Sequence, residues 1–190
     1  MISRIIEETT KAVTAAVEGV DSILDAVTNT VKKQVTGALQ GTGEVAGSAL
    51  EAVASVASGA IKAAGNVGAS VSDTAFSTMS GVVKGASDVG TDVITAARGG
   101  AEGIVKATAE TGGDIGSAAV SAVQSAIKSA GEVGADTSEA AHSAVGGALN
   151  AATDVGTDAA QTVREALLSS ASLPRDVIES AVKGSSKDSE

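Results

Sequence analysis

The chain has 190 residues, of which 43% are hydrophobic, yet it contains a single aromatic residue, one proline and no cysteine. This composition argues against a compact enzyme domain, because large aliphatic and aromatic side chains supply most of the buried area of an ordinary core. The absence of cysteine excludes disulfides and thiolate metal sites, and the formal net charge of -10 argues against nucleic acid and anionic membranes as main partners.

The first segment, residues 1–42, is predicted to be helical and carries larger aliphatic side chains than the rest of the chain. Ile2, Ile5 and Ile6 fall in the apolar register of the repeat that follows, and we expect them to act as terminal anchors. The segment lacks the basic stretch, the apolar run and the small-residue cleavage site that signal peptides contain. We therefore expect a protein of the cytoplasm or of the periphery of an intracellular surface.

The middle segment, residues 43–173, is predicted to be an array of 22-residue repeats. Two columns of charged residues recur at that spacing: Lys62, Lys84, Lys106 and Lys128, and Asp92, Asp114, Asp136 and Asp158. Each unit divides into two elevens, and eleven residues over three helical turns bring every third or fourth residue to one side. The predicted fold class is all-α, with long amphipathic helices that are either extended or folded into an antiparallel bundle.

A stripe of small and β-branched side chains along this array is the predicted interaction face. It comprises Val45, Val56, Ala64, Val67, Ala75, Val82, Ala86, Val89, Val93, Ala97, Ile104, Ile115, Ala119, Ile127, Ala130, Val133, Ala141, Ala152 and Val155. Alanine at its centre, with glycine pairs such as Gly81/Gly85 and Gly99/Gly103, would let a second helix backbone approach closely. Because interior glycines weaken an isolated helix, the face needs a partner: a second copy, another part of the chain, or lipid.

The opposite face carries the charged residues and offers little for catalysis. Lys84/Asp88 and Lys106/Glu110 have the spacing of local helical pairs, and two interpretations stay open: the charges set the stagger of neighbouring helices, or they form a solvated face. No calcium-loop motif follows the acidic residues, and the single histidine, His142, cannot form a metal cluster. We predict no catalytic, cofactor or metal site.

The end of the chain is predicted to contain a separate short helix. Pro174 should interrupt the helix near residues 171–174, and a helix should restart over 174–184 with Val177, Ile178 and Val182 as a second set of anchors. Residues 185–190 are predicted to be a disordered tail. No transmembrane span is expected, because the charge-free stretch 115–127 is too short to cross a bilayer.

The runs Ser121 to Ala141 and Val56 to Lys62 resemble the eleven-residue repeats of synucleins, perilipins, apolipoproteins and group 3 late-embryogenesis-abundant proteins, in period and in their Val, Ala, Gly and Thr content. The resemblance implies helicity gained on contact and adsorption to lipid droplets, membranes or dried surfaces. Synuclein repeats carry lysines flanking the apolar face, whereas lysine here occurs about once per repeat of 22 residues. This difference favours neutral lipid, granule surfaces or protein partners.

Taken together, the sequence predicts a non-enzymatic amphipathic-helix protein that coats an apolar interface and becomes ordered on contact. The alternative is a self-assembling helical bundle, filament or scaffold packed through alanine and glycine, which would be a homo-oligomer in solution. A stress-protective protein is a third hypothesis.

Overall fold

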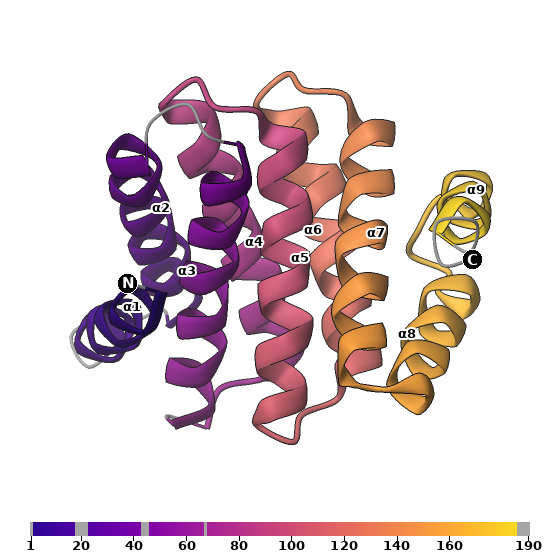
Figure 1. Cartoon of the computed structure of the whole chain (residues 1–190), viewed down its shortest axis with the longest axis horizontal. Helices are drawn as coiled ribbons and strands as arrows, with labels where there is room; N and C mark the ends of the chain where they lie inside the picture. The colour runs from indigo at the N-terminus through magenta and orange to yellow at the C-terminus, as the bar shows by residue number, and fades with distance from the viewer. Residues whose placement is uncertain (1, 18–22, 43–45, 67, 186–190) are drawn as a thin grey trace.

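The computed structural model describes residues 2–17, 23–42, 46–66 and 68–185, which form nine α-helices (Figure 1). The helices are α1 (Ile2–Val17), α2 (Ile23–Thr42), α3 (Ala46–Asn66), α4 (Val71–Asp88), α5 (Val93–Glu110), α6 (Ile115–Glu132), α7 (Thr137–Val155), α8 (Thr157–Ser169) and α9 (Arg175–Ser185). The predicted all-α class is confirmed, and the helices are folded onto one another as a bundle.

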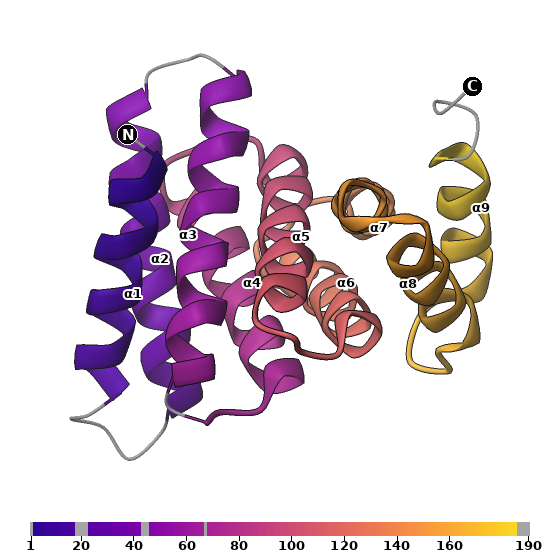
Figure 2. The ribbon, with the colours of Figure 1, turned by 60° about the horizontal axis from the view of Figure 1, so that its bottom comes forward.

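The helices form two layers, and each helix packs most extensively on a helix two positions away in the chain, before or after it. One layer contains α1, α3, α5 and α7, and the other contains α2, α4, α6 and α8. In Figure 1 the layer of α3, α5 and α7 lies in front of α4 and α6, and Figure 2 shows the stack turned by 60°. From α2 to α7, consecutive helices run in opposite directions, whereas α1 lies at a steep angle to α3 (Figure 1).

Each repeat of the middle segment is one helix followed by a tight turn that a glycine makes possible. Gly68, Gly90, Gly112 and Gly134 have φ between 69° and 78°, a backbone conformation that favours glycine. In the turn at Gly90, the Gly90 amide donates to the Ser87 carbonyl at 3.1 Å and the Thr91 amide donates to the Ala86 carbonyl at 3.0 Å. These bonds satisfy carbonyls that the end of a helix leaves free, so the helix stops there.

The aspartate column explains where the next helix begins. Asp92 accepts hydrogen bonds from the amides of Ile94 and Thr95, and Asp114 and Asp136 cap α6 and α7 in the same way. The solvated-face interpretation gave these aspartates no role beyond keeping the surface polar. In the structure they also start the helices that follow them. Asp158 differs, because it lies in the first turn of α8 and the residue before that helix, Gly156, makes no side-chain cap.

The predicted break before the C-terminal helix is confirmed. Helix α8 ends at Ser169, α9 begins at Arg175, and the Pro174 carbonyl accepts the first helical hydrogen bond from the Ile178 amide at 3.0 Å. Pro174 thus stands just before the helix rather than in its first turn. Ser185 ends α9, and the other residues of the predicted tail lie outside the described residues.

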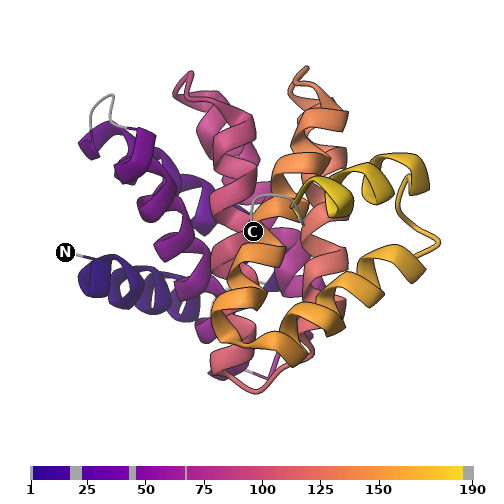
Figure 3. The same cartoon turned by 45° about the vertical axis from the view of Figure 1, so that its right-hand side comes forward.

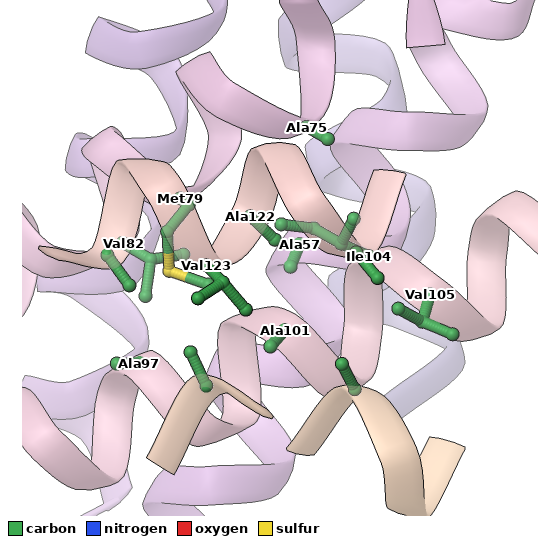
Figure 4. Packing of buried hydrophobic residues seen from close by; sticks show 14 of the residues in the cluster. Ala57, Ala75, Met79, Val82, Ala97, Ala101, Ile104, Val105, Ala122 and Val123 are labelled. Atoms are coloured by element: carbon green, nitrogen blue, oxygen red, sulfur yellow. The ribbon is translucent and has the colours of Figure 1, made fainter. Parts of the chain in front are cut away.

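The core consists mainly of alanine and valine, with a few larger side chains between the layers. Figure 4 shows part of this core, where Met79, Val82, Ile104 and Val123 meet alanines of neighbouring helices. Met79, Ile104, Leu167 and Ile178 are among the largest fully buried side chains. Low bulk therefore leads to closely spaced helices, which is how this composition builds a core.

Candidate interaction surfaces

The predicted interaction face lies mostly inside the bundle, against other helices of the same chain. Its buried members are Val56, Ala64, Ala75, Val82, Ala86, Ala97, Ile104, Ala119, Ala130, Ala141 and Ala152. Val89, Val93, Ile115, Ile127 and Val133 are half-buried, and Val155 is 49% exposed. Val45 and Val67 lie outside the described residues.

The predicted anchors lie on the first and last helices. On α9, Ile178 and Val182 are buried and Val177 is half-buried, whereas Ile5 and Ile6 on α1 are half-buried. The side chain of Ile2 is outside the described residues. The two sets lie on separate helices of the stack and do not form one patch.

A column of small residues makes the closest contacts within each layer. We call Gly59, Gly81, Gly103, Ser125 and Gly147, which are 22 residues apart, the contact column. A Cβ added at Gly81 would lie 2.6 Å from the Thr28 carbonyl oxygen, and one at Gly59 would lie 2.9 Å from that of Ile6. At Gly103 and Gly147 it would overlap the carbonyls of Ala54 and Arg98. From α3 to α7, each helix thus presents a small residue to the backbone of the helix two positions earlier.

Hydroxyl groups reinforce these close approaches. Ser125, the one member of the contact column with a side chain, donates from Oγ to the Phe76 carbonyl at 2.7 Å. The buried Ser58 hydroxyl donates to the Gly103 carbonyl at 3.0 Å, and Thr28 donates to Ser77 at 3.2 Å. These bonds join neighbouring helices of a layer beside the contact column.

Two members of the lysine column, Lys62 and Lys84, connect helices of the same layer rather than successive turns of one helix. Lys62 Nζ lies 2.7 Å from Glu110 Oε2, and Lys84 Nζ lies 3.0 Å from Glu132 Oε2. Lys32, which lies outside the lysine column, also joins α2 to α4 through Asp88 at 2.8 Å. The local pairing expected for Lys84 with Asp88 is therefore wrong. The observed geometry agrees with the stagger interpretation, although pairs exposed to this degree contribute only about 0–1 kcal/mol each.

A shallow groove of about 260 Å³ runs along the outside of α3 and α5 and is lined by both acidic and basic residues. On its α5 side, burial raises the pKa of Glu102; nearby Arg98 and Lys106 oppose the rise, while the carboxylates of Asp154 and Glu51 add to it. Glu51, Lys62, Lys106 and Glu110 also line the groove, and Lys62 and Glu110 form an ion pair with each other.

The part of the chain that the structure describes contains no group of three or more His, Cys, Asp or Glu residues suited to a metal ion. Within the same residues, no helix combines the length and apolar character needed to cross a bilayer. In comparisons with known proteins, no family model matches the chain and no curated protein matches it significantly.

Proposed function

We propose that this chain is a non-enzymatic structural protein that works as a folded helical scaffold. The observation that carries the proposal is the contact column, where glycines bring helix backbones together and the flanking apolar face packs inside the chain. Such contacts need a matching backbone at a fixed distance, which a neighbouring helix offers and a fluid lipid surface does not. The face predicted from the sequence is then the interior of the scaffold.

Coating of an apolar interface is the second candidate, and the low bulk of the core favours it. Most buried side chains between the layers are alanine and valine, so each helix buries less apolar area than it would with leucine or phenylalanine. A bundle of this kind could open and lay the same face on neutral lipid. In this case, the folded bundle would be the lipid-free state of a protein that acts on the lipid surface.

Circular dichroism and analytical ultracentrifugation, with and without a neutral-lipid emulsion, test the two candidates. The scaffold predicts high helicity in buffer, a cooperative unfolding transition and little change when emulsion is added. A largely unfolded chain in buffer that becomes helical only on the emulsion would overturn the scaffold and support the coat. A variant with aspartate on the buried face, Ala130→Asp, should lose helicity in buffer if the scaffold is correct.

A further inference from the structure

We propose that copies of this chain join head to tail, with α2 of one copy packed on the outer side of α8 of the next. This inference deepens the proposed scaffold function and rests on it. It follows from the way helices pack inside the chain, because both end helices of the second layer carry half of the same contact and lack the other half.

The first half of the contact is the side of a helix whose backbone carbonyls lie against glycines of the helix two positions later. We call it the receiving side. On α3, the carbonyls of Leu50 and Ala54 receive Gly99 and Gly103 of α5, and on α5 the carbonyl of Arg98 receives Gly147 of α7. The equivalent positions on α8, three repeats of 22 residues after Ile94 and Arg98, are Ala160 and Arg164. Since Arg98 itself receives a helix, an arginine at this position is compatible with close packing.

The receiving side of α8 forms an open groove. It has a volume of about 570 Å³, and its lining includes Ala160, Gln161, Arg164 and Leu168. Leu168 is 39% exposed, whereas Ser58, at the equivalent position of α3, is buried beneath α5. Helix α9 packs mainly on α7 and less on α8, and Figure 3 shows α8 (gold) and α9 (yellow) together at the C-terminal end of the stack.

The second half of the contact is the side of a helix that carries the contact-column glycine, which we call the presenting side. On α2 no other helix covers this side among the described residues. Gly37 belongs to the contact column, one repeat of 22 residues before Gly59. It is exposed, and a Cβ built on it would have no atom within 4 Å, whereas Gly59, Gly81, Gly103 and Gly147 all meet a backbone carbonyl. The glycine that would meet a preceding helix is therefore present, and the described part of the chain supplies no such helix.

The two sides of the proposed joint carry charges of opposite sign. Lys33 lies one turn before Gly37 on the exposed side of α2, and Glu165, which accepts a hydrogen bond from Gln161 Nε2 at 2.8 Å, lies beside Arg164 on the exposed side of α8. A second copy of the chain offers the helix that each side lacks, and because the two surfaces differ, such contacts add copies in a row.

Sedimentation velocity over a dilution series from micromolar to millimolar tests the joint, with circular dichroism on every sample. Wild type should form species larger than a dimer as concentration rises. Gly37→Leu blocks the α2 side and Leu168→Glu blocks the α8 side, so each variant alone should stay monomeric. An equimolar mixture should form a dimer and stop there, because each variant keeps the side that the other has lost. Gly65→Leu, at a glycine of α3 that also has open space around it, should assemble like wild type.

The remaining outcomes each overturn the proposal. Assembly of Gly37→Leu to the wild-type extent, or blocked variants that do not dimerise when mixed, would rule out a head-to-tail joint. A dimer of Gly37→Leu alone would indicate a symmetric contact through α8 instead. A wild type that is helical and cooperative but monomeric throughout would overturn this inference and leave the scaffold intact, whereas an unfolded wild type would overturn both.

Discussion

Substitution of a contact-column glycine by alanine separates two opposing effects of glycine in this protein. Alanine favours a helix by about 1 kcal/mol over glycine, so Gly→Ala at an open helical position should stabilise the protein. At Gly81, the new Cβ would lie 2.6 Å from the Thr28 carbonyl oxygen and 2.8 Å from Val31 Cβ, while ordinary contacts begin at 3.4 Å. Helices α2 and α4 would have to part by about 0.8 Å.

Such overpacking costs about 1–3 kcal/mol, which exceeds the gain in helix propensity. We therefore expect Gly81→Ala to lower the free energy of unfolding by about 1 kcal/mol or more. Gly65→Ala is the matched control, because no atom lies within 4 Å of its added Cβ, and it should raise stability by about 0.5 kcal/mol. Urea unfolding followed by circular dichroism measures both. If Gly81→Ala stabilises the protein as much as Gly65→Ala does, the close approach of α2 and α4 is refuted.

Three further predictions concern the core, the caps and the pH dependence. Ala86→Asp places a charge at a fully buried position and should lower the midpoint of thermal unfolding strongly or prevent folding. Thermal unfolding followed by circular dichroism measures this, and an unchanged midpoint would contradict the assignment of Ala86 to the buried face. Asp92→Ala removes the cap of α5 and should cost about 1 kcal/mol in urea unfolding, whereas Asp92→Asn should cost less, and equal effects would argue against capping. Because the folded state raises the pKa of Glu102 above 4.5, its ionised form destabilises the fold, and this penalty disappears as pH falls through the raised pKa. Glu102→Gln should therefore stabilise the protein at pH 7 and lose that advantage in acid, and an advantage independent of pH would contradict the burial of this carboxyl.

The apolar face, the repeat length and the last helix break follow from sequence, but the ends of the other helices do not follow from periodicity alone. Gly81 and Gly90 are both glycines among small residues, yet one packs within a helix and the other ends it. The distinguishing signal is the neighbour: Gly90 stands two residues before the cap Asp92, an order typical of a helix end followed by a helix start.

The ion pairs show a second limit of the sequence. Lys106 and Glu110 are four residues apart, which suggests a local pair, whereas Glu110 in fact pairs with Lys62 on another helix. Choosing between these partners requires knowing which helices are neighbours, and the period of the repeat does not say whether each helix packs on the next or on the one after. The glycine contacts decide this in favour of the helix after the next.

Zero-length carbodiimide cross-linking of the monomer, mapped by mass spectrometry, tests the arrangement of helices most directly. The reagent joins a lysine amine to a carboxylate only when the two are in contact, and Lys62–Glu110 and Lys84–Glu132 lie within 2.7 and 3.0 Å. The two-layer stack predicts links between these pairs and between Lys32 and Asp88, all within one chain. Links confined to residues four apart, such as Lys106 with Glu110 and Lys128 with Glu132, would contradict the stack and indicate isolated or extended helices.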